Sequence, residues 1–227
     1  MIILKIEPRK NRSNFLEVSA PVIAVFLTMI FGGFLFLSMG KNPFEAIKLI
    51  FWDPIMSPTF SEYSRPQLVI KAAPLILIAL GLSFGFRANI WNIGAEGQYI
   101  MGALISGSIG LALYPLDSMV IFPLMILGGI IGGILWAMIP AILKIRFNTN
   151  EILVSLMLVY VAEQILALAS VGFLRNPEGL GFPGSRDLSK YPSAANPELI
   201  TNSGIHMGVI FSIIAVNSLQ KSDNKTC

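Results

Sequence analysis

Long stretches without charge constrain the fold more than any other feature of the sequence. Residues 18–39 and 118–143 contain no charged side chain. A helix needs about 20 apolar residues to cross the hydrocarbon core of a bilayer, and runs of this length exceed the core of a signal peptide. With 54% hydrophobic and 13% charged residues overall, the chain is predicted to be an all-α, polytopic helical membrane protein.

Further apolar segments carry at most one charge each. They are residues 67–86 with Lys71, residues 88–114 with Glu96, and residues 152–174 with Glu163. A last run, 205–216, would rise about 18 Å as a helix, which is short of the hydrocarbon core of about 30 Å. We therefore expect about five full transmembrane segments and a partial sixth. The transmembrane domain is expected over 18–216, with an N-terminal tail at 1–17, an external loop rich in Pro and Gly at 175–204, and a polar tail at 217–227.

The basic residues predict the orientation of the chain. If the N-terminus is cytoplasmic, the cytoplasmic side receives most bases near segment ends: Lys5, Arg9, Lys10, Arg12, Arg87, Lys144 and Arg146. This distribution follows the positive-inside rule. The net charge of +3 is dispersed and forms no dense patch, so it does not indicate a nucleic-acid partner. Cys227 is the single cysteine, which excludes an intrachain disulfide framework and a cysteine metal site.

The polar stretch "NIGAEGQ" interrupts the third segment. Its members Asn92, Gly94, Glu96, Gly97 and Gln98 are poor helix formers or polar groups that hydrocarbon does not satisfy. Irregular backbone at membrane depth is tolerated only where protein or a water-filled cavity surrounds it. We therefore expect a broken or re-entrant element near 91–98, of the kind found in transporters.

Two readings of Glu96 remain open at this point. The carboxylate is either structural, capping a helix end or pairing with the candidate charge partner Lys71, or it contacts a passing solute. Lys71 alone fits a packed residue near a helix end. Glu163 and Gln164 are predicted to form hydrogen bonds between helices. His206 has no second ligand at metal-binding spacing and is expected to be interfacial.

Glycines four apart predict a helix-packing face in the fourth segment. The motif "GGIIGG" places Gly128, Gly129, Gly132 and Gly133 where two helices can approach closely.

The sequence contains no candidate set of catalytic residues. There is no G-x-x-x-x-G-K-[ST] loop for nucleotide phosphates, no His/Cys cluster and no G-x-S-x-G elbow. No catalytic residue, metal ligand or bound cofactor is therefore assigned, and the chain is not expected to be an enzyme.

Two long motifs resemble a known family. Residues 74–104, "PLILIALGLSFGFRANIWNIGAEGQYIMGAL", and 128–160, "GGIIGGILWAMIPAILKIRFNTNEILVSLMLVY", are similar to the membrane permease of bacterial ABC importers of the branched-chain amino acid and ribose type. "NIGAEGQ" with "NEILVSLML" is most similar to the nucleoside-importer branch. The resemblance covers about residues 18–212.

The resemblance implies a subunit that passes a small solute, with a nucleoside favoured, across the bacterial cytoplasmic (inner) membrane. Its implied partners are a second permease subunit, a cytoplasmic ABC ATPase that uses ATP, an extracytoplasmic solute-binding lipoprotein and membrane lipid. Carried onto this chain, the "NIGAEGQ" residues would shape the translocation path or act as a structural motif. Asn150 and Glu151 would form a cytoplasmic-side motif that begins the fifth segment.

The end of the chain departs from the family pattern. The family continues with a Thr-x-x-Gly element, an Asn-Pro and a Gly-Ile stretch, whereas this chain ends "IIAVNSLQKSDNKTC". We therefore expect a truncated, frameshifted or partly assembled reading frame. The alternative functions are a non-functional permease fragment or, less favoured, an ion-coupled secondary transporter that uses Glu96 and Lys71.

Overall fold

The computed structural model describes residues 14–179, 184–200 and 203–226. The basic residues Lys5, Arg9, Lys10 and Arg12 of the predicted N-terminal tail lie outside the described residues, as does Cys227. The chain divides into two compact units, Met1–Pro66 and Gln67–Cys227, and each is described by itself below.

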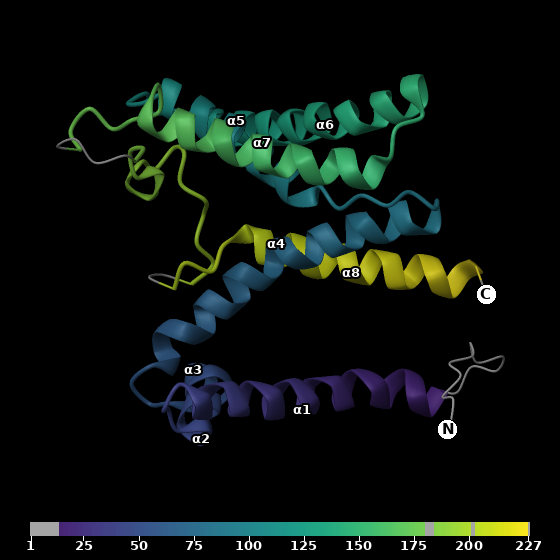
Figure 1. The fold of residues 1–227 in the computed structure, drawn as a ribbon. Helices are drawn as coiled ribbons and strands as arrows, with labels where there is room; N and C mark the ends of the chain where they lie inside the picture. Colours follow the sequence, from purple (N-terminus) through teal and green to yellow (C-terminus); the bar gives the residue numbers. More distant parts are fainter. Residues whose placement is uncertain (1–13, 180–183, 201–202, 227) are drawn as a thin grey trace. The chain divides into compact units, whose positions relative to one another are not determined.

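Helices make up nearly all of the regular structure (Figure 1). They are α1 (Asn14–Ser38), α2 (Pro43–Ile47), a π-helix (Lys48–Trp52), α3 (Asp53–Met56), α4 (Ser61–Arg87), α5 (Ala95–Ala112), α6 (Ile121–Phe147), α7 (Glu151–Val171), a 3₁₀ turn (Leu188–Lys190) and α8 (Met207–Thr226). Within the described ranges, extended pairing is limited to two isolated bridges, Arg175 with Ser185 and Glu198 with His206. The predicted all-α class is confirmed.

Four of the described helices are long and apolar enough to cross a membrane: 19–38, 61–87, 121–147 and 151–171. The third predicted segment differs, because only the 18 residues of α5 are helical. These span about 27 Å, and Glu96 and Gln98 lower the hydropathy of the first turn. α8 extends the predicted partial sixth segment into the polar tail, with an apolar part at Met207–Leu219. The chain is a multi-pass membrane protein.

In the first unit, three short helices, α2, the π-helix and α3, follow α1. The side chain of Asn42 accepts a hydrogen bond from the Phe44 amide and caps α2. Helix α1 packs on α2, where a β-carbon added at Gly33 would lie 3.6 Å from Pro43 Cβ. Further along the chain, Arg65 Nε donates to the Ile55 carbonyl at 2.6 Å.

In the second unit, α5 packs against both α6 and α7 (Figure 1). The glycines of "GGIIGG" meet α5 along this contact. A β-carbon at Gly132 would stand 3.1 Å from the Met101 carbonyl oxygen, and one at Gly102 would stand 2.9 Å from that of Gly129. At Gly128 an added β-carbon would overlap the end of the Ile109 side chain, and at Gly133 it would lie 3.5 Å from the Gln98 carbonyl oxygen. Small residues thus bring two helix backbones together.

The α6–α7 connection is short because two asparagines end one helix and start the next. Asn148 adopts the left-handed conformation with φ 50° and its amide donates to the Lys144 carbonyl. The side chain of Asn150 then accepts from the Ile152 and Leu153 amides. Left-handed C-terminal residues and Asn N-caps satisfy backbone groups that a helix leaves free at its ends.

A segment of the loop after α7 folds onto the α5–α6 turn. The Tyr191 hydroxyl donates to the carbonyls of Leu113, at 3.1 Å, and Leu116, and Ser193 Oγ bonds the Asp117 carboxylate. Tyr191 and Ala194 are buried with Ile121 and Met125. We call residues 184–195 the strap. It ties the end of α7 to the turn at the far end of α5 and α6.

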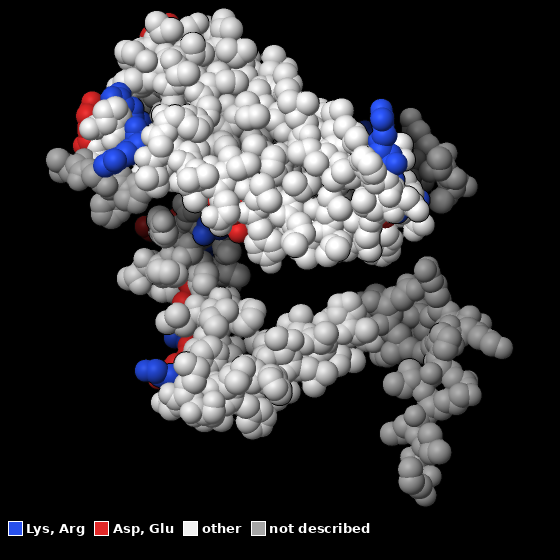
Figure 2. All heavy atoms as spheres, turned by 45° about the horizontal axis from the view of Figure 1, so that its top comes forward, with Lys and Arg blue, Asp and Glu red and all other residues white. Residues whose placement is uncertain are grey.

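Charged side chains gather at the two ends of the second unit. On the face that Figure 2 shows, blue and red atoms cluster at each end, with a broad band of other residues between them. Lys144 and Arg146 lie in the last turn of α6, and Glu178 pairs with Arg186 in the loop after α7 at 3.2 Å. Such a band is the surface that a helix bundle presents to hydrocarbon.

Candidate functional site

The chain is irregular between α4 and α5. Helix α4 ends at Arg87, Asn89 has a left-handed φ of 58°, and α5 begins only at Ala95. The Gly94 amide donates to Asn92 Oδ1 at 2.9 Å, which closes an asparagine turn. The broken element predicted near 91–98 is therefore present at residues 91–94, whereas 95–98 belong to the first turn of α5.

The irregular segment is held against the start of α7. The Ile93 amide donates to Ser155 Oγ at 3.3 Å, and Ser155 Oγ donates to the Ile152 carbonyl at 3.1 Å. A β-carbon at Gly94 would stand 2.7 Å from the Ser155 carbonyl oxygen. Both Gly94 and Ser155 are buried. A free amide in the break is thus satisfied by a side chain from another helix, as burial in protein requires.

Gly97 makes the next contact along the same face of α5. A β-carbon there would lie 3.2 Å from the Val159 Cα and 3.2 Å from Trp136 Nε1. The indole nitrogen of Trp136 is buried and has no hydrogen-bond partner within the described part of the chain. Gly97 therefore lies at a point where α5 contacts both α6 and α7.

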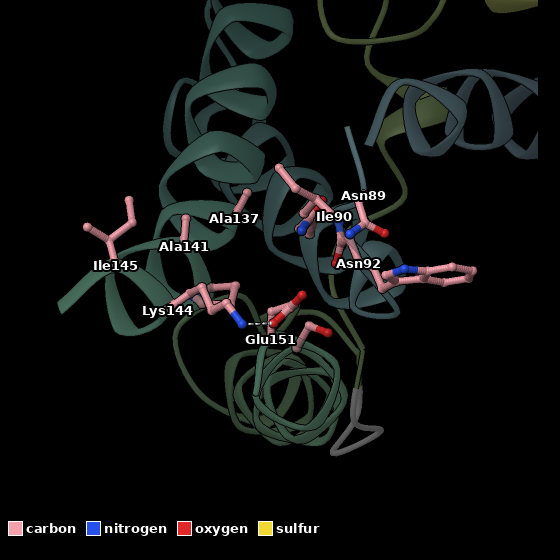
Figure 3. Close-up of a pocket in the computed structure, with 12 residues that line it drawn as sticks. Asn89, Ile90, Asn92, Ala137, Ala141, Lys144, Ile145 and Glu151 are labelled. Carbon is pink, nitrogen blue, oxygen red and sulfur yellow. Dashed lines mark ion pairs between the residues drawn. The ribbon is translucent and has the colours of Figure 1, made fainter. Parts of the chain in front are cut away.

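A cavity of about 300 Å³ opens beside the break (Figure 3). It is lined from the irregular segment, the first turn of α5, the end of α6 and the start of α7 by Asn89, Ile90, Trp91, Asn92, Gln98, Ala137, Pro140, Ala141, Lys144, Ile145, Glu151 and Ser155. Its polar groups are mainly amides and a hydroxyl. Apolar walls with a few polar groups are typical of small-molecule sites.

The two charged groups of this cavity neutralise each other. Lys144 Nζ lies 2.7 Å from Glu151 Oε2 (Figure 3). The Glu151 side chain is about a quarter exposed and that of Lys144 about half exposed, at 23% and 45%. The pair joins the end of α6 to the start of α7, next to the Asn150 cap. The cavity therefore carries no net charge.

A second cavity of about 540 Å³ lies on the α4 side of the break. It shares Ile90, Asn92, Gln98 and Ala137 with the first cavity. The rest of its wall comes from α4, α5 and α6: Ile78, Gly81, Leu82, Gly85, Ala95, Tyr99, Gly129, Ile130, Gly133 and Ile134. The side chains of Asn92 and Gln98 thus stand between two adjoining hollows.

Glu96 and Lys71 line neither cavity. Glu96 is exposed in the first turn of α5, where a carboxylate interacts favourably with the positive end of the helix dipole. Lys71 is exposed on α4, and the two residues form no ion pair in the described part of the chain. Glu96 therefore lies outside the two cavities, although Asn92 and Gln98 of the same motif line both of them.

Several lining residues were not singled out from the sequence. Ser155 and Lys144 lie next to the motif residues Asn150 and Glu151, and Ser155 follows Glu151 by one helical turn. That spacing was the available signal, because residues four apart share a helix face. Trp136, which lines neither cavity but lies against Gly97, gave no comparable signal.

His206 lies directly before the start of α8. Its Nδ1 accepts from the Gly208 amide at 3.2 Å. Among the described residues, no three His, Cys, Asp or Glu side chains gather as metal ligands.

Comparison with known protein families places most of this chain within one family model. The family described as the permease component of the branched-chain amino acid transport system matches residues 65–223. The matched range includes the break, both cavities and part of the polar tail. No solved structure matches the chain.

Three curated relatives are similar over most of this chain. The glucose ABC transporter permease protein TsgB13 of Haloferax volcanii is 28% identical over 94% of this chain and 57% of its own length. The guanosine ABC transporter permease protein NupP of Bacillus subtilis is 28% identical over 86% of this chain and 54% of its own. The nucleoside ABC transporter permease protein NupB of Lactococcus lactis is 26% identical over 88% of this chain and 55% of its own. The chain thus spans about half the length of these relatives.

Proposed function

Because the chain belongs to the family of branched-chain amino acid transport system permease components, we propose that it is a membrane permease subunit of an ATP-driven importer. It passes a small solute through the bilayer and carries out no covalent chemistry. ATP hydrolysis belongs to a separate cytoplasmic ABC ATPase. An extracytoplasmic binding lipoprotein delivers the solute, and a second permease subunit completes the membrane part.

The observation that carries the proposal is the pair of adjoining cavities at the α4–α5 break. Their lining is apolar, with amide groups from Asn92 and Gln98 and one internally neutralised ion pair, Lys144 with Glu151. A charged solute would lose hydration there without gaining a counter-charge. A neutral solute with an apolar face and a few hydrogen-bonding groups suits this lining.

The favoured solute is a nucleoside. The relatives are named for guanosine, nucleosides and glucose, all of which are uncharged at neutral pH. Amide side chains such as Asn92 and Gln98 both donate and accept hydrogen bonds, which matches the edges of a nucleobase as well as sugar hydroxyls. An apolar wall with Trp91 and Tyr99 favours the flat base over a sugar alone.

The motif residues take distinct roles in this proposal. Asn92 and Gln98 contact the solute, whereas Gly94 and Gly97 let α5 approach α7. Glu96 stabilises the start of α5. Asn150 and Glu151 begin α7 on the cytoplasmic side of the inner membrane, together with Lys144. This orientation places the N-terminus in the cytoplasm, in agreement with the positive-inside rule.

Uptake in cells tests the proposal. The chain is produced with the ATPase, the binding lipoprotein and the second permease subunit from its own genome in a bacterium that lacks nucleoside uptake, and entry of labelled guanosine and glucose is measured. We expect guanosine uptake that requires an intact ATPase and persists when a protonophore collapses the proton gradient. Absence of uptake of both solutes, or uptake that ignores ATPase loss, contradicts the proposal.

Matched glutamine substitutions test the cavity itself. Gln98→Leu keeps the side-chain volume but removes the amide, so we expect at least a tenfold loss of guanosine uptake. Gln67→Leu is the control, because Gln67 is also half-buried but lines neither cavity. Equal uptake by the two variants at equal protein level would remove Gln98 from the solute path.

A further inference from the structure

The polar side chains around the break differ in how many of their hydrogen-bonding groups remain free. Asn92 and Gln98 line both cavities, and Ser155 lines the smaller one (Figure 3). Bonds that these side chains already make within the protein decide which of their groups can still bind a solute.

The hydroxyl of Ser155 has no hydrogen left for a solute. A serine hydroxyl has one hydrogen to donate, and that of Ser155 goes to the Ile152 carbonyl at 3.1 Å. The same oxygen accepts from the Ile93 amide at 3.3 Å, and the residue is only 2% exposed. The bond to Ile93 therefore holds the backbone directly after Asn92 and leaves Ser155 without a free donor.

The side-chain oxygen of Asn92 is also engaged, which fixes the orientation of its amide group. The Gly94 amide donates to Asn92 Oδ1 at 2.9 Å, and a carboxamide nitrogen cannot accept such a bond. Nδ2 is then the other branch of the amide group, with two hydrogens to donate. It forms no hydrogen bond with another residue that the structure describes. The free group of Asn92 is therefore a donor.

Gln98 carries no such restriction. Its side chain forms no hydrogen bond within the described part of the chain, so its amide oxygen and nitrogen both remain available. A solute can thus meet a donor or an acceptor at Gln98, whereas it meets a donor at Asn92.

We propose that Asn92 selects the solute as a hydrogen-bond donor through Nδ2, and that Ser155 is the positioning residue that holds Asn92 in place. This inference rests on the proposed function, since it requires that a solute passes the junction of the two cavities. The solute presents an acceptor there, such as a base carbonyl, a ring nitrogen or a sugar oxygen. A solute that presents only N–H groups at this point leaves donors on both sides unpaired and is disfavoured.

Hydrogen exchange tests the Ser155 contact without a transport assay. The chain in lipid nanodiscs is exchanged in heavy water, and deuterium uptake is measured in peptides that contain Ile93. Ser155→Ala should raise exchange there severalfold, because the Ile93 amide loses its acceptor. Ser108→Ala is the control, because the Ser108 hydroxyl donates to the Leu104 carbonyl of its own helix. Equal exchange in the two variants overturns the role of Ser155.

Asparagine-to-aspartate substitutions test the donor. Asn92→Asp keeps an oxygen for the Gly94 amide, and Asp favours the same turn, but the substitution removes both N–H groups. We expect guanosine uptake at saturating solute and equal protein level to fall about fivefold, the size of one hydrogen bond, with exchange of residues 90–94 unchanged. Uptake that is retained or increased shows instead that the oxygen contacts the solute, and overturns the donor role.

Asn89→Asp is the matched control for the added charge. Asn89 is exposed and lines only the first cavity. Because a solvated charge is screened, this variant should lose less than about twofold of the uptake. Equal losses in the two aspartate variants would assign the effect to charge and overturn the donor role.

A double-variant cycle tests whether Ser155 acts through Asn92. Ser155→Ala should lower uptake about threefold in the wild-type chain but change it little in the Asn92→Asp chain, where no donor remains to be positioned. The same factor in both backgrounds overturns the positioning role, since a purely structural loss would not depend on residue 92. Absence of uptake by every chain, with normal protection of Ile93, refutes the proposed function and with it the solute contact at Asn92, but leaves the Ser155 bond confirmed.

Discussion

The Ser155 carbonyl oxygen of α7 lies 2.7 Å from the point where a β-carbon on Gly94 would stand. This contact fixes the start of α5 against the start of α7. It also explains why a glycine interrupts an otherwise apolar segment at this position, since any larger residue would push the two chain segments apart.

Substitution of Gly94 should therefore lower stability. Gly94→Ala is expected to destabilise the protein by about 1–3 kcal/mol, as overpacking does in other cores, and Gly94→Val by more, because the branched side chain also restricts the backbone. Thermal denaturation of the detergent-solubilised protein measures the effect. Gly107→Ala is the control, because a β-carbon there meets nothing within 4 Å. Equal midpoints for Gly94→Ala and Gly107→Ala would contradict the contact.

The α5–α6 glycines should differ among themselves. A β-carbon at Gly102 would meet the Gly129 carbonyl oxygen at 2.9 Å, whereas at Gly128 the obstacle is the tip of the Ile109 side chain. The Ile109 side chain can move away by changing its rotamer, whereas a backbone carbonyl cannot. Gly102→Ala should therefore lower the melting temperature by several degrees more than Gly128→Ala. The reverse order in the same denaturation assay would show that the helices do not approach at Gly102.

Loss of the Asn150 cap should weaken the start of α7. Asn150→Ala leaves the Ile152 and Leu153 amides without their acceptor, and the expected destabilisation is about 1 kcal/mol. Asn150→Asp retains an acceptor and adds a favourable charge at the helix N-terminus, so it should keep wild-type stability. Thermal denaturation of the two variants side by side decides the point, and equal losses would count against capping.

Neutralising Glu96 should have a small effect. Its carboxylate is exposed in the first turn of α5 and lines neither cavity, so Glu96→Gln should lose only the dipole interaction, about 0.3–1 kcal/mol. Guanosine uptake at equal protein level should stay within about twofold of wild type, because a change of 0.3–1 kcal/mol leaves most of the protein folded. A tenfold loss of uptake with normal protein level would instead assign Glu96 to the solute path.

Removal of the Tyr191 hydroxyl should release the strap. Tyr191→Phe loses the bonds to the Leu113 and Leu116 carbonyls, so trypsin should cleave after the exposed Lys190 severalfold faster in membrane vesicles with that side accessible. Tyr63→Phe, at a tyrosine that is 70% exposed, is the control and should cleave like wild type. Identical digestion of both variants would show that the hydroxyl does not hold the strap.

The same hydroxyl predicts how the strap responds to pH. Burial, followed by the nearby Asp117 carboxylate, raises the pKa of Tyr191 above its ordinary value of 10.0. A group whose pKa is raised on folding contributes its full stabilisation below the unfolded pKa and loses it as pH rises through the folded pKa. Cleavage after Lys190 should therefore be constant up to about pH 10, once corrected for trypsin activity, and increase only above it.

The helices could be predicted from the sequence because their signal is local. Apolar runs long enough to cross a bilayer, with at most one charge each, predicted α1, α4, α6 and α7, and the Asn and Gly residues of "NIGAEGQ" indicated where α4 and α5 are separated. The position of Glu96 on the first turn of α5 was not predictable, because it depends on whether the break ends before or after Gly97. That choice follows from Ser155, which binds the segment 62 positions earlier in the chain.

The strap could not be predicted from the sequence for the same reason, because its contacts are with residues far away along the chain. Its residues are polar and rich in Pro and Gly, which indicates only a loop, while its anchor points in the α5–α6 turn lie 75 to 78 positions earlier. Likewise, the helix cluster at 43–56 is short, and α8 continues beyond its apolar part. Hydropathy alone does not define the end of a helix whose last turns are polar.

The strap has a mechanical consequence for the second unit. The turn at Asn148–Asn150 and the Lys144–Glu151 pair join α6 to α7 at one end, and Tyr191 links the chain after α7 back to the α5–α6 turn at the other. Helices α6 and α7 are thus linked at both ends, and these links oppose the sliding of one helix past the other along the roughly 40 Å of α6. We therefore expect a displacement at the Lys144 end to move α6 and α7 together as far as the strap.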